Sequence, residues 1–227
     1  MRIYENMKQA LSEVQRDLSE MGVEVKTKSM QDKIIEGNDD FVTKEIQAYQ
    51  FCVLNTADKD DTVENLDWCK AEFTERISNK GLNPGEAWKL RKSVWEEFLH
   101  GNPKKFGYTY SERMKGQVED VIRVLKNDIE SRQAIIQIYD QNIDNKNRGG
   151  KVRIPCSISY HFMYREGKLD MIYNMRSCDI FTHFRNDIWM ACKLKDYIAE
   201  KLGVKSGKFF MFVSSLHAYK KDCKGIF

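Results

Sequence analysis

In the first half of the chain, apolar residues recur every three or four positions, which is the pattern of amphipathic helices. Five of them form one stripe and predict a first helix that Gly22 closes: Met7, Leu11, Val14, Leu18 and Met21. The same spacing predicts three more helices: one with Leu66, Phe73 and Ile77, one over about 86–99, and one with Met114, Val118, Val121, Ile122 and Leu125. A short apolar segment at 23–25 follows the first helix.

In the second half, the pattern changes to that of strands. Residues 133–139 have strand composition, and the segments 157–164 and 168–175 flank Arg165-Glu166-Gly167 as a hairpin. A helix over about 186–202, closed by Gly203, leads to a last strand over 208–219. The polar stretch 140–151 is predicted to be an exposed loop. The pattern predicts one α+β domain over residues 1–227, with helices first and the sheet after them.

Composition excludes several classes of protein. With 41% hydrophobic and 31% charged residues, the chain is not a disordered tail. Its formal charge of +3 is too balanced for a nonspecific nucleic-acid binder, so no nucleic-acid partner is expected. The longest apolar runs, such as 209–213, are too short to span a membrane, and the first residues lack the apolar core of a signal peptide. We therefore expect a cytosolic protein without a membrane partner.

The cysteines and histidines do not form a metal motif. Six cysteines are scattered without a CxxC pair, so we expect reduced thiols. Four histidines without an HExxH pattern make a protein-bound metal unexpected. Neither GxGxxG nor GxxxxGK[ST] occurs, which removes the familiar dinucleotide and P-loop assignments.

The candidate chemistry begins at Pro155-Cys156, where a polar loop enters a strand. A polar constellation follows: Arg176-Ser177-Cys178-Asp179, then Asp187, then His217-Ala218-Tyr219. An arginine near a thiol lowers its pKa and can also bind phosphate with two donors. A lone buried cysteine is more often structural, so the constellation carries the hypothesis.

These residues resemble the thymidylate synthase superfamily. The resemblance rests on Pro155-Cys156, Arg176-Ser177-x-Asp179, His217-x-Tyr219 and Asp128-x-x-Ser131-Arg132, with gaps of 20 and 61 residues from Cys156 to Arg176 and His217. It covers about 108–219, whereas the first hundred residues match loosely and the Arg-Thr-Gly phosphate loop is not visible. It implies a thymidylate synthase-like mixed sheet packed with helices and a sheet-mediated homodimer.

The base-reading position lies 31 residues after Cys156, where thymidylate synthases carry an asparagine and this chain has Asp187. An amide matches O4 and N3-H of uracil. A carboxylate instead accepts from the N4 amine of cytosine and shares a proton with N3. The sequence therefore resembles the deoxycytidylate and cytidylate 5-hydroxymethylases most, although a slip of one residue to Asn186 would restore uracil reading.

The resemblance implies a mechanism. Cys156 adds to C6 of the pyrimidine, and C5 then attacks the methylene carbon of 5,10-methylenetetrahydrofolate. Water gives a 5-hydroxymethyl product, whereas hydride gives a methyl group. The short segment after His100-Gly101, without an evident folate-covering tryptophan, favours water. Glu97 is the expected general acid/base, with Glu96 in reserve.

The remaining roles also follow from the resemblance. Arg176 and Ser177 would bind the 5′-phosphate of a pyrimidine nucleoside monophosphate, and Arg132 would reach it from the partner subunit. His217 and Tyr219 would hold the sugar, Asp179 would position base and folate, and Tyr110 would be the active-site tyrosine. Gln133 replaces a second family arginine, for which Lys26 or Lys28 would compensate.

Each residue alone has a commoner structural role. Asp187 would be a helix cap, His217 a core residue, Glu96 and Glu97 solvated, and Arg132 a surface ion-pair partner. Only their joint spacing favours catalysis. The rival functions are a cytidylate C5-methyltransferase, a thymidylate synthase or uridylate hydroxymethylase, and a noncatalytic nucleotide-binding or RNA-binding homologue.

Overall fold

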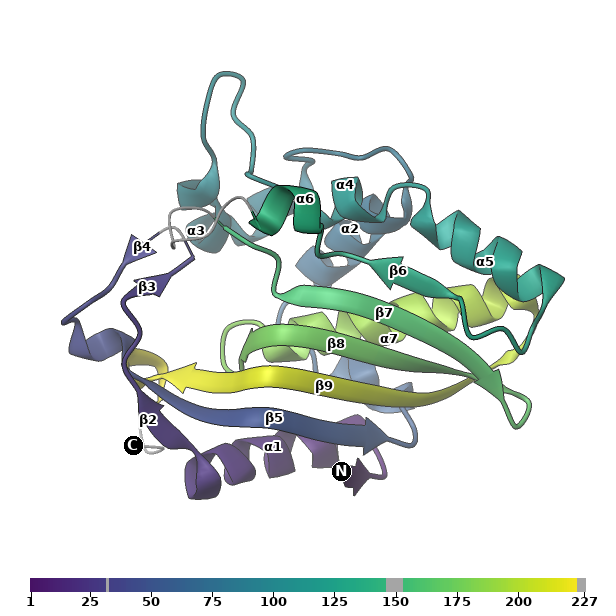
Figure 1. Ribbon diagram of the computed structural model, residues 1–227, viewed down its shortest axis with the longest axis horizontal. Coiled ribbons are helices and arrows are strands. Elements are labelled where there is room, and N and C mark those ends of the chain that lie inside the picture. The colour runs from purple at the N-terminus through teal and green to yellow at the C-terminus, as the bar shows by residue number, and fades with distance from the viewer. Residues whose placement is uncertain (32, 146–152, 224–227) are drawn as a thin grey trace.

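A mixed β-sheet forms the centre of the computed structural model, which describes residues 1–31, 33–145 and 153–223 (Figure 1). The strand order is β1-β5-β9-β8-β7-β6, with β2 paired to β5 and a separate hairpin of β3 and β4. The strands are β1 (Arg2–Tyr4), β2 (Val23–Val25), β3 (Ser29–Met30), β4 (Lys33–Ile34), β5 (Thr43–Val53), β6 (Ile135–Gln137), β7 (Ser157–Arg165), β8 (Lys168–Asp179) and β9 (Lys205–Tyr219).

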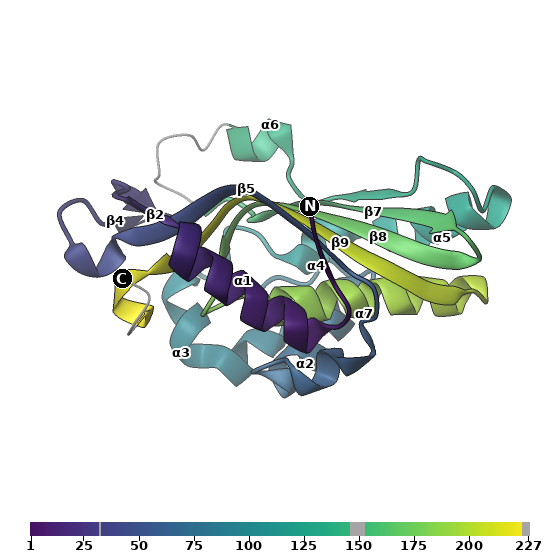
Figure 2. The ribbon, with the colours of Figure 1, turned by 90° about the horizontal axis from the view of Figure 1, so that it is seen from below.

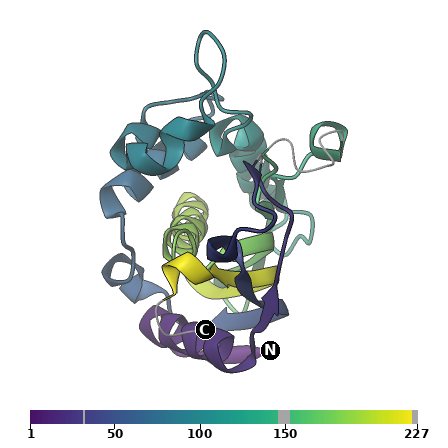
Figure 3. The same cartoon turned by 90° about the vertical axis from the view of Figure 1, so that its left-hand side faces the viewer.

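Helices cover one face of this sheet. Figure 2 shows α1, α2, α3 and α7 on one side of the sheet and the short α6 on the other, and Figure 3 shows α7 between α1 and the helical segments of residues 66–114. The helices are α1 (Met7–Met21), α2 (Leu66–Ile77), α3 (Lys92–Trp95), α4 (Tyr110–Met114), α5 (Gln117–Asn127), α6 (Gln141–Asp144) and α7 (Phe184–Leu202). The α+β class and the mixed sheet packed with helices are thus confirmed.

The alternation of side chains along the strands builds the core. Phe51, Met211, Tyr173 and Tyr160 lie in register across β5, β9, β8 and β7, and all are buried against the helices. The residues between them point to the other face of the sheet. One contiguous hydrophobic cluster therefore runs from Tyr4 to Cys223.

The helix predicted over 86–99 is wrong as a continuous element. Short 3₁₀ turns at Ala87–Arg91 and Glu96–Phe98 flank the four-residue α3. The break lies at Arg91, whose φ of −131° and ψ of 45° are not helical and whose guanidinium lies 4.7 Å from the centre of the Trp68 ring. Likewise, the helix predicted to run on from Met114 is divided, because Gly116, at φ 79°, separates α4 from α5.

The predicted order of helices first and sheet after them is also wrong. Strand β5 comes from the first quarter of the chain and pairs with β9 along most of its length, from Thr43↔Tyr219 to Val53↔Phe209. In the stretch predicted to be a loop, residues 141–144 form α6, where the buried Asp144 accepts from Arg113 at 2.7 Å. Residues 146–151 of that stretch lie outside the described residues. Within the described part of the chain, no helix is long and apolar enough to cross a membrane.

Candidate active site

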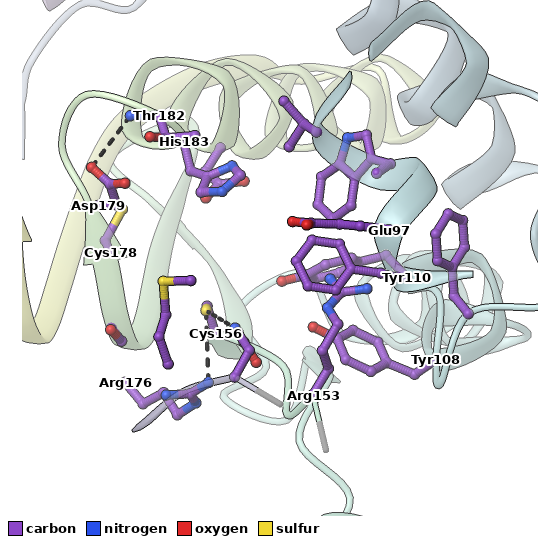
Figure 4. A pocket seen from close by; sticks show the side chains of 18 of the residues that line it. Glu97, Tyr108, Tyr110, Arg153, Cys156, Arg176, Cys178, Asp179, Thr182 and His183 are labelled. Carbon is purple, nitrogen blue, oxygen red and sulfur yellow. Dashed lines mark hydrogen bonds between the residues drawn. The ribbon is translucent and has the colours of Figure 1, made fainter. Parts of the chain in front are cut away.

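A cavity of about 500 Å³ opens where β8 and β9 end and the helical segments come together. Nine of the ten candidate residues line it: Glu97, Tyr110, Cys156, Arg176, Ser177, Asp179, Asp187, His217 and Tyr219. They come from segments far apart in sequence, and Figure 4 shows several of them around one space. The fold therefore assembles the constellation that the spacing indicated.

The thiol of Cys156 lies between two nitrogen donors. Its Sγ is 3.6 Å from Nε2 of Gln31 and 3.8 Å from Nη2 of Arg176 (Figure 4). Burial raises the pKa of Cys156, whereas the positive charges of Arg176 and Arg153 and the Gln31 hydrogen bond act in the opposite direction. Positive charge stabilises both a thiolate and a bound anion. This part of the cavity can therefore hold a cysteine nucleophile beside an anionic ligand.

The Arg176 side chain also holds the loop that carries Cys156. Its Nε donates to the carbonyl of Pro155 at 2.9 Å, and its Nη2 donates to the carbonyl of Ile154 at 2.8 Å. Arg176 lies on β8, and its backbone N–H donates to the carbonyl of Cys156 at 2.9 Å. In this structure, the arginine predicted to bind phosphate therefore fixes the backbone that positions the thiol.

Asp187 and its neighbour Asn186 point to different places. Asp187 lines the cavity, and the described residues give its carboxylate no direct hydrogen bond. Burial raises its pKa to about 6, while Arg76 and Arg91 act to lower it. Asn186 is 1% exposed and contacts Cys69 and the backbone N–H of Asn65, away from the cavity lining. Of the two, only Asp187 can meet a ligand in the cavity.

A charged cluster on α2 lies near Asp187 and was not predicted. Arg76 donates through Nε to Glu72 at 2.9 Å, and its guanidinium lies 4.0 Å from the centre of the Tyr110 ring. Glu72 lines the cavity and acts to raise the pKa of Asp187. Tyr110 bonds the hydroxyl of Ser157 at 3.0 Å, at the start of β7. A carboxylate, a tyrosine and a buried arginine therefore adjoin the expected base reader.

Glu97 lies in the same cavity but on its more open side. Its side chain is 51% exposed and pairs with Lys33 at 2.7 Å, whereas the Glu72 side chain is 19% exposed. The cavity lining includes Glu97 and not its reserve, Glu96, which pairs with Lys92 at 3.3 Å.

Aromatic rings form a large part of the cavity wall. Trp68, Trp88 and Trp95 all line it, as do Phe98, Phe106 and Tyr108. The sequence offered no evident tryptophan to cover a folate, but the 3₁₀ turns around α3 bring Trp88 and Trp95 to this wall, so a lack of tryptophan does not support water as the final reactant. Arg153 lies against three of these rings, 4.6 to 5.1 Å from the centres of Trp95, Phe98 and Tyr108.

The ends of β8 and β9 bring the other polar residues together. Asp179 accepts from the backbone N–H groups of Phe181 at 3.0 Å and Thr182 at 3.3 Å, which fixes the turn into α7. His217 lies opposite Asp179 in the β8–β9 register and packs edge-on against Tyr219 at 5.2 Å. Burial lowers the pKa of His217, so its imidazole is neutral at pH 7.

Three predicted cationic residues are not among the lining residues. Arg132 is exposed just before β6, and its carbonyl contacts Nε2 of His161 at 3.0 Å. Lys26 and Lys28 are exposed, and Lys28 pairs with Glu36 at 3.1 Å. Thr27 between them does line the cavity. Within the described residues, no group of three His, Cys, Asp or Glu side chains is placed to hold a metal ion.

The sequence reasoning missed Gln31, Glu72, Arg153 and His183, all of which line the cavity. Glu72 lies four residues from both Trp68 and Arg76, so the three side chains share one face of the second predicted helix. This spacing is the signal in the sequence that could have indicated Glu72. Gln31 and Arg153 lie in irregular segments without a periodic pattern, and no local signal marks them.

Comparison with known proteins agrees with this geometry. The family model described as Thymidylate synthase matches residues 67–226. A protein of Methanothermobacter thermautotrophicus named "Putative thymidylate synthase" is 34% identical over 135 residues, 57% of this chain and 59% of that protein. The "Deoxyuridylate hydroxymethyltransferase" of Bacillus phage SP01 is 35% identical over 107 residues, 47% of this chain and 28% of the phage protein. The chain thus spans less than two thirds of these relatives.

The fold has a counterpart among solved structures. The thymidylate synthase from T4 phage superimposes with a TM-score of 0.68 at 18% identity, covering 94% of this chain and 77% of the phage chain. At this identity the likeness establishes the fold. The family model covers well over half of the chain and reaches from α2 through the Cys156 region to the end of β9. The chain therefore belongs to the thymidylate synthase family.

Proposed function

We propose that this protein transfers a one-carbon unit from 5,10-methylenetetrahydrofolate to C5 of a cytidine monophosphate and completes the reaction with water, giving a 5-hydroxymethyl nucleotide. The observation that carries the cytosine assignment is Asp187, a cavity carboxyl with no direct hydrogen-bond partner among the described residues. A carboxyl with a pKa near 6 exists in both protonation states near neutrality. It can therefore share one proton with N3 while it accepts from the N4 amine.

The thiol of Cys156 is the proposed nucleophile toward C6. Arg176 and Arg153 provide positive charge beside it, and Gln31 donates a hydrogen bond that favours the thiolate. Arg176 can exchange its bonds to the Ile154 and Pro155 carbonyls for a nucleotide phosphate, with Ser177 beside it as a hydroxyl donor. His217 and Tyr219, at the end of β9, are the proposed sugar contacts.

The aromatic wall fits the proposed folate. A flat heterocycle stacks well on indole and phenyl rings, and Trp88, Trp95 and Phe98 offer such faces in a cavity of about 500 Å³. The folate supplies the methylene carbon when it is bound. Asp179 holds the turn next to this wall through Phe181 and Thr182, so we propose that it positions base and folate together.

We propose Glu72 as the general acid/base near C4, ahead of the Glu97 predicted from sequence. Glu72 is the more enclosed of the two side chains, pairs with the buried Arg76, and acts on the pKa of Asp187. Glu72→Gln should lower kcat by about 10²–10⁴-fold, because the amide cannot transfer a proton. The matched change Glu97→Gln should lower kcat less than tenfold, since it removes a half-exposed ion pair with Lys33.

Steady-state rates of both variants with the cytosine nucleotide test this order, with thermal unfolding as a check on folding. The reverse ranking, a large loss in Glu97→Gln and a small one in Glu72→Gln, would return the role to Glu97.

The reaction is tested by incubating the protein with CMP, dCMP or dUMP and methylenetetrahydrofolate, and identifying the products by mass. A hydroxymethylcytosine nucleotide together with tetrahydrofolate supports the proposal. A methyl product with dihydrofolate would identify a methyltransferase. Use of dUMP alone would group the chain with uracil readers, the substrate class in the name of the SP01 relative. Nucleotide binding without loss of the C5 proton would indicate a noncatalytic homologue.

We further propose that the 1–227 domain acts in the cytosol as a homodimer formed through the open face of the sheet. That face carries partly exposed apolar side chains that alternate with the core residues: Ile46, Ile172, Phe210 and Phe212. Apolar surface of this kind is typical of an interface. Arg132 is exposed and outside the cavity of its own chain, as expected of a residue that acts in the partner's site.

Hybrid dimers test this arrangement. Arg132→Ala and Cys156→Ala should each be inactive alone. After subunit exchange, a mixture should regain up to about a quarter of wild-type activity, because half of the dimers are hybrids with one intact site. Exchange is verified with two differently tagged chains. Verified hybrids without recovered activity would exclude a shared site.

A further inference from the structure

His183 occupies the N-cap position of α7, but its side chain does not cap the helix. It is the residue that precedes Phe184, and its side chain makes no capping hydrogen bond. The turn before it is fixed instead by Asp179, which accepts from the N–H groups of Phe181 and Thr182. Capping positions favour Ser, Thr, Asp or Asn, so local helix chemistry does not explain a histidine here.

The imidazole of His183 faces the cavity. It lies 5.9 Å from the Trp95 ring, centre to centre, at an angle of 43°. Figure 4 shows it beside the same space that Cys156, Tyr110 and Glu97 surround. Within the described residues, neither ring nitrogen has a hydrogen-bond partner. The side chain is partly exposed to the cavity, so its ring nitrogens are accessible to a ligand or a water there.

The charge state of this imidazole suits a proton acceptor. Burial lowers the pKa of His183 to about 4; Asp179 acts to raise it, and Arg91, Arg153 and His217 act to lower it further. The ring is therefore neutral at pH 7 and keeps one nitrogen lone pair as an acceptor. The nearby Asp179 carboxylate would stabilise the imidazolium formed when the ring takes a proton.

We propose that His183 holds the water that attacks the exocyclic methylene of the pyrimidine and takes the proton that this water loses. The proposal rests on the proposed function, because it assigns the residue that makes the product a hydroxymethyl group. Asp187 follows His183 by one helical turn, with its N–H bonded to the His183 carbonyl at 2.9 Å. With the N3–N4 edge at Asp187 and C6 at Cys156, C5 and its substituent would lie between these two residues, in the cavity that His183 also lines.

The step balances without a further reactant. The water oxygen forms a bond to the methylene carbon, and the proton of the water passes to His183. The electron pair of the exocyclic double bond moves to C5 and then forms the C5–C6 double bond, and the bond from C6 to the Cys156 sulfur breaks. The thiolate is regenerated, the imidazolium returns its proton to solvent, and no oxidation or reduction occurs.

Two variants separate this role from packing. His183→Phe keeps a flat ring against Trp95 but has no nitrogen, and His183→Asn can bind water but cannot accept its proton. Both should release tritium from [5-³H]-cytosine nucleotide in a single turnover within about threefold of wild type, because the methylene forms before water adds. Formation of the hydroxymethyl nucleotide should fall by about 10²-fold. Added 2-mercaptoethanol should then trap the methylene as a thioether, measured by mass.

The outcomes distinguish the two proposals. Hydroxymethyl formation at the wild-type rate in either variant overturns the role of His183 and leaves the proposed function intact. Equal losses of tritium release and of product, with a lower melting temperature, would mean that His183 only supports the fold, which also overturns the role. A wild-type protein that makes a methyl product refutes the proposed function itself, whatever the variants do.

Discussion

Cys156→Ser is expected to abolish turnover, with kcat reduced by about 10⁴-fold or more, as is typical when the nucleophile of a covalent mechanism is removed. A serine hydroxyl stays protonated at neutral pH, and the charges of Arg176 and Arg153 that favour a thiolate cannot make it comparably nucleophilic. Serine can still accept from Gln31 and Arg176, so the fold should be retained. Tritium release from [5-³H]-cytosine nucleotide measures the loss.

A matched control shows whether the effect belongs to this thiol. Cys52 is a buried free thiol on β5, and it is not among the residues that line the cavity. Cys52→Ser should therefore keep tritium release within a few-fold of wild type while lowering stability by about 1 kcal/mol, because it buries a hydroxyl. Equal activity in Cys156→Ser and wild type would remove Cys156 from the mechanism. A covalent nucleotide adduct, seen by mass in wild type and absent in Cys156→Ser, would be the positive sign.

The second half of the fold followed closely from its pattern, and the first half did so only in part. The hairpin of β7 and β8, the helix α7 and the strand β9 have long periodic segments with clear ends, such as Gly203 at φ 69°. Strand β5 was missed because its side chains alternate weakly. Lys44, Glu45 and Gln47 precede the apolar residues, and the strand is specified by its long pairing with β9. Tertiary pairing of this kind leaves little trace in a local window of sequence.

The site likewise contains residues that the sequence pattern indicated and residues that it did not. Cys156, Arg176, Asp179, Asp187 and His217 lie on or beside regular elements, where a fixed spacing in sequence becomes a fixed position in space. Glu72 and His183 come together with them only when α2 packs against the start of α7. The 3₁₀ turns around α3 are also set by tertiary contacts, including the Glu75 carboxylate that accepts from the N–H groups of Glu86 and Ala87. Contacts between distant segments determine these features, so the sequence pattern could not indicate them.

Asp187→Asn is expected to reverse the base preference. In the orientation that donates to O4 and accepts from N3-H of uracil, the amide sets a donor against the N4 amine of cytosine and an acceptor against its unprotonated N3, so both contacts are mismatched. A buried unpaired polar group costs about 1–3 kcal/mol, so kcat/KM should fall about tenfold or more for the cytosine nucleotide and rise by a similar factor for the uracil nucleotide. Rates measured with both nucleotides give the ratio directly.

Asp187→Asn should also change how the stability of the protein depends on pH, which is measured without an activity assay. Burial raises the pKa of Asp187 to about 6 from an ordinary 3.8, so the native state binds this proton more tightly than the unfolded state does. The favourable contribution of this bound proton to the free energy of unfolding is fully present below about pH 4 and is lost as the pH rises through about 6. Asp187→Asn removes this dependence. Relative to wild type, the variant should therefore gain melting temperature as the pH rises from 4 to 7, and an unchanged difference across that range would contradict the buried state of the carboxyl.

Asn186→Asp is the matched control, because it makes the opposite exchange one position away. Asn186 contacts Cys69 and Asn65 and is not among the residues that line the cavity, so a carboxylate there should lower stability and leave the base preference unchanged. A switch of preference in Asn186→Asp, with none in Asp187→Asn, would mean that Asn186 reads the base and that the substrate is a uracil nucleotide. The expected pattern, a switch only at Asp187, would make one carboxylate at the start of α7 the determinant of substrate choice.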